Sequence, residues 1–554
     1  MRIVPALTVT REEIDLMVAN LRRRLEAGVT GIVTDCAAYN RTLGDDRTAE
    51  FLLGQIGPEQ RRTTKMEATE TKVGAGSGIA PLKGSKGLPS ICIIGAGVGG
   101  ISMAGALKKK GIPFDCFDKR EKIGGIWAFD EKLENTSVWH GLNMNTPSGW
   151  YQYSDFPMPE NYPDFPQWHQ VQAYLESYVD HLDMRGSFHL GNEVSEAKRL
   201  DDGKWRVVLG SGETRYYDAV IVANGHHNTP NFPDYADKID FDGPAIHSQH
   251  YRYRHEYRDK NVMIVGIGNS GAQIAVDVSF DTKQTYISLR RGVYLLPHYM
   301  FGMRVDKFLG PTLSWWFKKM LPGKLYALYF TGVYHLLGNH RGIGMPKPDH
   351  LMMTCLPTVT ESLANRIGDG KIKLVPEVKS IEGNTVTLAD DSTIEVDAII
   401  YSTGYHTTLP FFEKDFFEVR ENKIPLFKRL FKPDTPNLAF VGMFQAIRWG
   451  FLDVMETQAK LIASYFAGEY SLPDEDAMEA DIEAERKQVE REFMHTLRNN
   501  YYLHGDTYIR ELRKEQKRGE RRIKSGDKPG DFPVGDDVIS TQQANEHRLV
   551  TAAE

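Results

Sequence analysis

The sequence predicts an α/β protein with two parallel sheets, and two observations lead to this prediction. A short apolar strand runs into a glycine-rich turn and then a helix at two places, residues 91–110 and residues 262–278. Each unit closes with a further apolar strand, which ends at Gly225 in the first unit and at Gly404 in the second. Alternating strands and helices favour parallel pairing. The internal repeat therefore predicts two Rossmann-like domains of one architecture.

The composition excludes several classes of protein. The 67 Lys and Arg residues against 74 Asp and Glu residues give a net charge of −7, whereas a generally basic nucleic-acid-binding protein needs an excess of positive charge. The longest strongly apolar stretch, residues 325–338, is shorter than the ~20 residues of a membrane span. Four scattered cysteines fit neither a disulfide framework nor a structural zinc site, and the N-terminus has no signal-peptide pattern. We therefore expect a cytoplasmic enzyme.

Both glycine-rich turns have the GxGxxG spacing of a dinucleotide site. The glycines are Gly95, Gly97 and Gly100 in the first turn and Gly266, Gly268 and Gly271 in the second, where Asn269 and Ser270 fill the spacing. In such a turn the first glycine permits the tight bend, the second lets the backbone approach a pyrophosphate, and the third lets the helix pack on the strand. The N–H groups at the start of the helix then bind the anion. Because each turn lies between an apolar strand and a helix, both predict dinucleotide binding.

The charge at the end of the next strand differs between the two units. In the first unit this strand ends at Asp118, 23 residues after Gly95, and Lys119 follows in the same expected site. A carboxylate there accepts hydrogen bonds from the ribose hydroxyls of an adenosine and repels a 2′-phosphate, which suits FAD. In the second unit Arg290 and Arg291 stand at the equivalent offset, and their positive charge favours the 2′-phosphate of NADPH. The alternative is that the two arginines are ordinary solvated surface residues.

These sites divide the chain into segments. We expect an N-terminal extension and linker at residues 1–88, an FAD-binding domain at 89–240 and 396–470, an NADPH-binding domain at 241–395 inserted within it, charged helices at 471–525 and a disordered tail at 526–554. Two dinucleotides on one chain imply hydride transfer from nicotinamide to flavin. No CxxC pair is present to take the electrons further, which leaves dioxygen or a small diffusible acceptor.

Several short motifs of the central region resemble those of the flavin-containing monooxygenases. The most specific is Phe-Asp-Gly-Pro-Ala-Ile-His-Ser-Gln-His-Tyr-Arg at residues 241–252, which matches the family pattern FxGxxxHxxx(Y/F)(K/R). Further matches are Gly-Gly-Ile-Trp at 124–127, Asn-Thr at 145–146, Ser-Thr-Gly-Tyr at 402–405, Gly-Met-Phe-Gln at 442–445 and Glu-Thr-Gln at 456–458. The resemblance covers about residues 88–468.

The resemblance implies an FAD- and NADPH-dependent monooxygenase. In the family, NADPH reduces FAD, dioxygen forms a C4a-hydroperoxyflavin, and NADP⁺ stays bound while a soft nucleophile, an amine nitrogen or a sulfide sulfur, takes the distal oxygen. The related Baeyer–Villiger monooxygenases, which insert oxygen beside ketones, carry Trp followed by Pro or Asp where Tyr251 and Arg252 stand here. Oxygenation of a small amine or sulfide is therefore the leading expectation, and ketone oxygenation is the alternative. A third reading is a cofactor-binding scaffold without turnover.

The resemblance also implies roles for individual residues. Asn145 is the expected catalytic side chain, hydrogen-bonded near the contact of flavin and NADP⁺, and the alternative is that this asparagine merely forms a turn before Thr146 and a proline. The residues expected on the flavin side are Gly125, Trp127, Thr146 and Gln445. His247 is expected in the cofactor site as the residue that fixes the linker between the two domains, and not as an acid or base.

The sequence departs from the family pattern at two places. The usual Asn-Thr-Ser-Lys is Asn-Thr-Pro-Ser at residues 145–148, and the first closing strand is followed by His226 and His227. Two adjacent histidines suggest a metal site. Neighbouring side chains of an extended chain point apart, however, and no third ligand is evident. We therefore expect no metal.

The remaining segments carry weaker signals. Residues 295–337 form an aromatic and basic insert, which is either a substrate-channel lid or weak membrane-surface contact, or a helical cap packed on the NADPH-binding domain. Residues 10–25 have the pattern of an amphipathic helix, and residues 2–14 resemble the C-terminal segment of class III aminotransferases without implying transaminase activity. We also expect a homo-oligomer.

Overall fold

The computed structural model describes residues 87–131, 136–238, 240–300, 302–308, 324–337, 340–417, 419, 421–447 and 450–526. All of them belong to the second of the two units into which the chain divides, Ala80–Glu554. The expected helix at residues 10–25, the aminotransferase-like segment, the central part of the aromatic insert and the tail after Gly526 lie outside the described residues.

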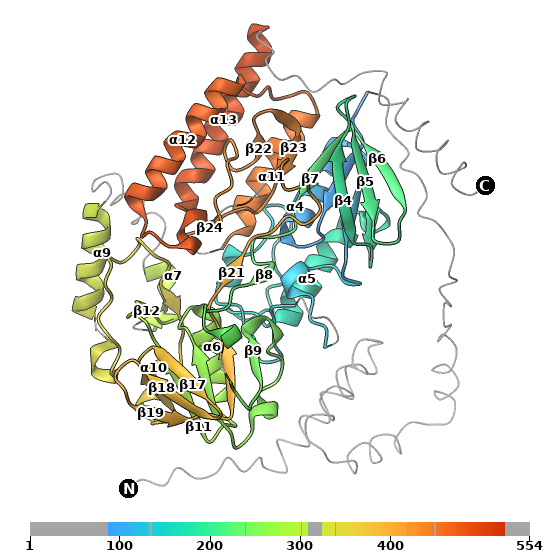
Figure 1. The fold of residues 1–554 in the computed structure, drawn as a ribbon. Helices are drawn as coiled ribbons and strands as arrows, with labels where there is room; N and C mark the ends of the chain where they lie inside the picture. Colours follow the sequence, from blue (N-terminus) through green and yellow to red (C-terminus); the bar gives the residue numbers. More distant parts are fainter. Residues whose placement is uncertain are drawn as a thin grey trace, which may run out of the picture. The chain divides into compact units, whose positions relative to one another are not determined.

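A six-stranded sheet contains the strand that leads into the first glycine-rich turn (Figure 1). Its order is β22-β23-β7-β1-β2-β3, and all neighbours are parallel except β22 and β23. The strands are β1 (Ile91–Ile94), β2 (Phe114–Asp118), β3 (Phe188–Leu190), β7 (Ala219–Val222), β22 (Phe431–Lys432) and β23 (Thr435–Phe440). Helices α4 (Val98–Lys110), α5 (Trp168–His181) and α11 (Leu452–Phe466) share one apolar core with these strands. Consequently every side chain of β1 and β7 is buried, as parallel sheets covered by helices require.

A five-stranded sheet contains the strand that leads into the second turn. Its order is β16-β11-β10-β20-β9, and all neighbours are parallel. The strands are β9 (Ala245–His247), β10 (Asn261–Val265), β11 (Gln284–Ser288), β16 (Ile372–Val375) and β20 (Ala398–Tyr401). Helices α6 (Asn269–Val278) and α10 (Leu363–Gly368) pack with this sheet in a second core. The two parallel sheets predicted from the internal repeat are thus confirmed.

One expected boundary was drawn too early. The NADPH-binding segment was expected to end at residue 395, yet strand β20, which follows that residue, pairs with both β10 and β9 in the second sheet. The reason is that the closing strand of each unit pairs with the first strand of the same unit, as β7 also pairs with β1. The other domain boundaries stay predictions.

Short sheets lie between and beside the two large ones. The antiparallel groups are β4 (Val194–Arg199), β5 (Trp205–Leu209) and β6 (Thr214–Tyr217), then β17 (Val378–Glu382), β18 (Thr385–Leu388) and β19 (Thr393–Glu395), and the pair β13 (Tyr299–Met300) and β14 (Met303–Arg304). Strand β12 (Leu295–Leu296) is parallel to β15 (Thr358–Val359). Strand β8 (Thr229–Pro230) is antiparallel to β21 (Tyr405–His406), so the two segments that connect the large sheets run side by side.

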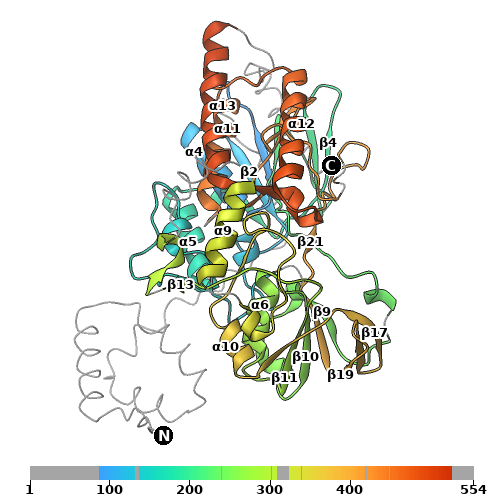
Figure 2. The same ribbon diagram turned by 90° about the vertical axis from the view of Figure 1, so that its left-hand side faces the viewer.

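The charged C-terminal segment forms two helices, α12 (Glu475–Glu492) and α13 (Gly505–Ser525). Helix α13 packs alongside α11, which Figure 2 shows from the side. Between α12 and α13, strand β25 (Tyr502–Leu503) pairs in parallel with β24 (Gln445–Ala446). The C-terminal segment is therefore joined to the chain directly at Gln445, one of the residues expected beside the flavin.

The described part of the aromatic insert contains α7 (Val305–Phe308) and α9 (Lys324–Leu337). One side of α9 contributes Phe330 and Tyr334 to a small apolar core, while Leu325 and Leu328 are 56% and 55% exposed. The helical cap is therefore present, and it also keeps an apolar outer side. Among the described residues, no helix combines the length and apolarity needed to cross a membrane.

Candidate dinucleotide sites

The first glycine-rich turn is shaped by close backbone contacts. Gly95 has φ +111°, and a Cβ on it would lie 2.5 Å from the Ala223 carbonyl oxygen. A Cβ on Gly100 would lie 1.8 Å from the Gly95 carbonyl oxygen. Gly97 stands at the N-cap of α4, where no side chain caps the helix. The N-terminal N–H groups of α4 are thus left for an anion.

Asp118 lies over this turn, as expected for a ribose-binding carboxylate. Its Oδ2 accepts the Ala96 N–H at 2.8 Å, and its Oδ1 accepts the Arg120 N–H at 2.8 Å. These two bonds orient the carboxylate and leave it further acceptor capacity, because each carboxylate oxygen has two lone pairs. Lys119, the next residue, is exposed.

The second turn repeats this geometry. Gly266 has φ +100°, and a Cβ on it would lie 2.7 Å from the Ser402 carbonyl oxygen. A Cβ on Gly271 would lie 2.2 Å from the Gly266 carbonyl oxygen. Gly268 is the N-cap of α6, again without a side-chain cap. The N-terminus of α6 is therefore a second place for an anion.

The two residues inside the second fingerprint differ in their contacts. Asn269 uses its Oδ1 to accept the Val359 N–H at 2.9 Å, so its side chain holds β15 in place. Ser270 is half-buried, and its hydroxyl has no hydrogen-bond partner among the described residues. Ser270 is thus the better placed of the two to meet a ligand.

The two arginines at the end of β11 have different surroundings. Arg290 is exposed. Arg291 lies with its Nη1 3.8 Å from Asp349 Oδ2 and donates from Nη1 to Met494 Sδ at 3.3 Å. The Asp349–His350 hydrogen bond and, to a lesser extent, the proximity of Arg291 lower the pKa of the Asp349 carboxyl. Sequence reasoning missed Asp349 and Met494, because no local pattern links these distant segments to β11.

The segment expected beside the flavin packs directly on the first turn. The Gly124 N–H donates to the Ala96 carbonyl at 3.0 Å, and a Cβ on Gly125 would lie 2.7 Å from the Gly97 Cα. Trp127 is buried and donates from Nε1 to the Tyr151 hydroxyl at 2.8 Å. Burial raises the pKa of Tyr151, so its hydroxyl stays protonated.

Asn145 follows Met144, whose backbone is held in place because its N–H donates to the Pro166 carbonyl at 2.8 Å. The Asn145 side chain is half-buried and makes no hydrogen bond to any described residue. An asparagine that forms a turn would bond its own local backbone, and this one does not. Thr146, the next residue, is buried. The Asn145 amide is therefore available to a bound molecule.

Gln445 lies at the start of β24, in a segment that hydrogen bonds connect to the C-terminal helix α13. Gln445 is 7% exposed, and its neighbour in the loop, Gly442, has φ +82° and donates its N–H to Gln458 Oε1 at 3.0 Å. Gln458 in turn donates from Nε2 to the Tyr508 hydroxyl at 2.8 Å. The Tyr508 hydroxyl donates to the Lys428 carbonyl at 2.5 Å. The motif at 456–458 marked Gln458, but its partner in α13 left no signal in the sequence.

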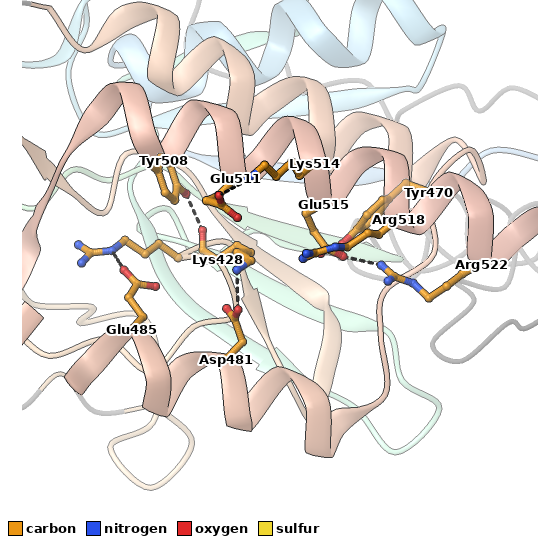
Figure 3. A network of polar contacts seen from close by, with 11 residues as sticks. Lys428, Tyr470, Asp481, Glu485, Tyr508, Glu511, Lys514, Glu515, Arg518 and Arg522 are labelled. Carbon is orange, nitrogen blue, oxygen red and sulfur yellow. Dashed lines mark hydrogen bonds and ion pairs between the residues drawn. The ribbon is translucent and has the colours of Figure 1, made fainter. Parts of the chain in front are cut away.

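A network of charged residues joins the segment at residues 428–429 to α12 and α13 (Figure 3). Buried Arg429 pairs with Glu485 and donates to the Tyr501 and Tyr502 carbonyls at 2.6 and 3.0 Å. Lys428 pairs with Asp481 in α12. Because Tyr502 belongs to β25, this network holds the strand that pairs with Gln445.

His247 is fully buried and links the two connecting segments. Its Nε2 lies 3.0 Å from the Gly404 carbonyl oxygen, and its Nδ1 accepts the Gln249 N–H at 3.2 Å. Burial lowers the pKa of His247 to about 4. The ring is therefore neutral near pH 7, with both nitrogens engaged in hydrogen bonds, which fits a role in fixing the linker rather than in proton transfer.

His226 and His227 lie next to the Gln445 loop. The Nδ1 atom of His226 is 3.1 Å from the Gly442 carbonyl oxygen, and its ring packs on Tyr501, 5.3 Å between centroids. The His227 ring stacks on Tyr405. Among the described residues, no group of three His, Cys, Asp or Glu side chains is arranged to hold a metal ion.

A sequence profile decides the family. The profile of the flavin-binding monooxygenase-like (FMO-like) family matches residues 89–516. The chain belongs to this family. It is therefore a flavin-dependent monooxygenase, and the FMO-like region extends beyond the expected limit near residue 468 through α12 and into α13.

Curated relatives agree with the FMO-like assignment. Flavin-containing monooxygenase 5 of Homo sapiens is 30% identical over 430 residues, which cover 74% of this chain and 80% of that protein. Dimethylaniline monooxygenase (N-oxide-forming) 2 of Rattus norvegicus is 31% identical over 415 residues, which cover 72% of this chain and 77% of that protein.

Solved structures share the FMO-like fold. S-allyl-L-cysteine S-oxygenase from Allium sativum superposes with a TM-score of 0.56 and 22% identity, covering 85% of this chain and 100% of that one. Cyclohexanone monooxygenase from Rhodococcus sp. Phi1 bound to NADP⁺ superposes with a TM-score of 0.59 and 17% identity, covering 79% of this chain and 99% of that one. At these identities the structures support the fold alone.

Proposed function

We propose that this protein is an FAD- and NADPH-dependent monooxygenase that oxygenates an amine nitrogen or a sulfide sulfur of a small organic molecule. The observation that carries the proposal is the pair of uncapped helix N-termini behind two tight glycine turns, with Asp118 beside one and Arg290 and Arg291 beside the other. An acidic ribose contact suits FAD, and a basic pair suits the 2′-phosphate of NADPH.

The residues present fit both dinucleotides. The backbone at Gly95 and at Gly266 has no room for a side chain, so each turn keeps the tight bend that a dinucleotide site requires. The N-terminus of α4 and Asp118 would hold FAD, and the N-terminus of α6 with Arg290 and Arg291 would hold NADPH. When bound, the nicotinamide supplies a hydride and the flavin supplies the chemistry that activates dioxygen.

The protein's own residues would orient these groups and keep water away. The Asn145 amide offers both a donor and an acceptor to the cofactors, because it is not engaged elsewhere among the described residues. Trp127 and Gln445 are both buried and would help to exclude water on the flavin side. His247 holds the linker in its neutral form, since burial keeps its pKa at about 4.

The relatives favour oxygenation of a heteroatom. One curated relative is named for forming an N-oxide, and one solved structure is an S-oxygenase. Oxygenation of a ketone is the second candidate, because cyclohexanone monooxygenase shares the fold at a TM-score of 0.59. The Tyr251–Arg252 pair, in place of Trp followed by Pro or Asp, favours the first.

The test uses the purified full-length chain. We expect bound flavin with its yellow absorbance, loss of that absorbance when NADPH is added without oxygen, and sulfoxide formation from a thioether in air. A lactone from a cyclic ketone, without sulfoxide, would favour the second candidate. Flavin binding without NADPH oxidation would indicate a scaffold. A colourless protein that stays colourless after incubation with FAD would refute the proposal.

A further inference from the structure

The loop that precedes Asn145 is held by residues of the second sheet and its helix. The His140 N–H donates to the Arg252 carbonyl at 3.0 Å, and the Trp139 ring meets the Tyr251 ring edge-on at 5.9 Å between centroids. Gln273 of α6 donates from Nε2 to the Asn143 carbonyl at 3.4 Å. These contacts all come from the signature segment at 241–252 or from α6.

The other side of the same loop is held by the first domain. Trp168, the first residue of α5, donates its N–H to the Leu142 carbonyl at 3.2 Å and its Nε1 to the His140 carbonyl at 3.1 Å. The Met144 N–H donates to the Pro166 carbonyl at 2.8 Å. The loop at residues 139–144 is therefore a bridge between the two dinucleotide domains, and Asn145 stands at its end.

One tyrosine–aspartate pair lies against this bridge, with Tyr251 buried and Asp277 half-buried. The Tyr251 hydroxyl donates to Asp277 Oδ2 at 2.6 Å, and the Tyr251 side chain is fully buried. The other oxygen, Asp277 Oδ1, faces Gly141, where a Cβ would lie only 2.7 Å away. The groups that face the carboxylate are thus the Tyr251 hydroxyl, the Gly141 backbone, Arg254 Nη1 at 3.9 Å, His140 and Asp281.

The chemistry of the pair fixes its hydrogen-bond direction. Burial raises the pKa of Tyr251 far above its usual value, and burial also raises the pKa of Asp277. The phenol therefore stays protonated near pH 7 and donates to Asp277 Oδ2 at 2.6 Å.

We propose that Tyr251 and Asp277 are positioning residues that set the place of Asn145 by holding the 139–144 bridge. The inference rests on the proposed function of Asn145 and assigns a role to the tyrosine of the signature segment. The Tyr251 ring packs against the Trp139 ring, and the carbonyl of the next residue, Arg252, accepts the His140 N–H. Asp277 fixes Tyr251 and supports Gly141 at the same time.

The test compares Tyr251→Phe and Asp277→Ala with Asp277→Asn, which keeps an acceptor oxygen for the tyrosine. Tyr257→Phe is the matched control, because Tyr257 is a buried tyrosine on the neighbouring turn whose hydroxyl makes no hydrogen bond to the bridge within the described part of the chain. Gly141→Ala is a second route to the same loop should Tyr251→Phe not fold, since its Cβ would meet Asp277 Oδ1 at 2.7 Å.

The first readout needs no cofactor. In the ligand-free protein, amide hydrogen exchange of the peptide over residues 139–146 should be at least ~10-fold faster in Tyr251→Phe and Asp277→Ala, and within ~2-fold of wild type in Asp277→Asn and Tyr257→Phe. Exchange over α4 should be unchanged in every variant. The inference would be overturned if the bridge peptide exchanged equally fast in Tyr251→Phe and in wild type. If Tyr251→Phe does not fold, the same comparison is made between Gly141→Ala and wild type.

The second readout asks whether the bridge positions Asn145. The share of oxidised NADPH that ends as free hydrogen peroxide should rise several-fold in Tyr251→Phe, while FAD content and the NADP⁺ dissociation constant stay within ~2-fold. A loosened bridge with an unchanged peroxide share would overturn the inference. Failure of wild type to bind flavin or to oxidise NADPH would instead refute the proposed function, and the exchange experiment would still report on the bridge.

Discussion

At the scale of single residues, we propose that the two arginines after β11 decide which nicotinamide cofactor fits. We predict that Arg290→Glu with Arg291→Ala raises the KM for NADPH by at least ~10-fold and changes the KM for NADH by less than ~3-fold, because only NADPH carries the phosphate that the guanidinium groups bind. Steady-state oxidation of both cofactors measures the ratio. Lys283→Ala, an exposed cation at the other end of β11, is the control.

A variant of Asp349 tests the same phosphate site, with the opposite change expected in the KM for NADPH. Its carboxylate lies 3.8 Å from Arg291 and would repel a phosphate placed there. Asp349→Asn should therefore lower the KM for NADPH by about 2- to 3-fold, in the direction opposite to the arginine variant. An unchanged preference for NADPH over NADH in both variants would show that this end of β11 does not read the phosphate.

His247 gives a prediction about pH. Its pKa of about 4 in the folded protein lies below its ordinary value of 6.5, so the unfolded chain takes up a proton first as the pH falls. Its contribution to stability is therefore complete above about pH 6.5 and is lost as the pH falls through 4. Between pH 7 and pH 5 the unfolding free energy should drop by about 2 kcal/mol more in wild type than in His247→Gln, which cannot titrate. Urea denaturation at both pH values measures the difference, and equal drops would contradict it.

The residue scale also shows what local sequence can predict. Both glycine turns, Asp118 and the arginine pair follow from spacing along one strand and one helix, and the structure places each at its expected end of the sheet. Asp349 and Met494 contact Arg291 from other segments. Such contacts depend on how distant parts of the chain pack, and no spacing rule records them.

At the scale of secondary-structure elements, the sequence predicted which segments form strands better than it predicted which strands pair with each other. The apolar runs of β1 and β10 and their helices follow from hydrophobic pattern. The assignment of β20 to the first domain failed, because the closing strand of each unit pairs with the first strand of the same unit. The pairing of β24 with β25 was also beyond prediction, since these strands have two residues each and are held by the Arg429 network.

That network gives a prediction about stability. Arg429→Ala should lower the unfolding free energy by about 3–5 kcal/mol, because Glu485 and the Tyr501 and Tyr502 carbonyls all lose a buried partner. It should also weaken FAD retention, since β25 supports the strand of Gln445. Arg486→Ala is the matched control on α12: its ion pairs with Glu483 and Glu490 are exposed, so its loss should lower the unfolding free energy much less.

Denaturant unfolding with flavin absorbance and circular dichroism followed together measures both effects. Equal losses of stability in the two arginine variants would show that burial of Arg429 does not matter. A normal FAD content in an unstable Arg429→Ala protein would separate β25 from the flavin site.

At the scale of the whole described unit, two domains with separate apolar cores must take part in one reaction. A second set of contacts crosses between them, at the aromatic insert. Arg304 pairs with Asp164 Oδ1 at 2.5 Å and with Asp306 Oδ2 at 2.9 Å, and Asp306 Oδ2 accepts the Trp150 Nε1–H at 2.8 Å. Trp150 stands five residues after Asn145. The insert is thus tied to the chain that leads away from the candidate catalytic residue.

Breaking this tie should uncouple the reaction without unfolding the protein. We predict that Arg304→Ala raises the share of NADPH lost as hydrogen peroxide about 2- to 5-fold, because a looser insert admits water beside the cofactors. Arg185→Ala, which removes an exposed pair with Asp180 inside the first domain, should leave that share unchanged. Peroxide is assayed against NADPH consumed, with the thermal midpoint as a check on folding. An equal peroxide share in both variants would contradict this role of the insert.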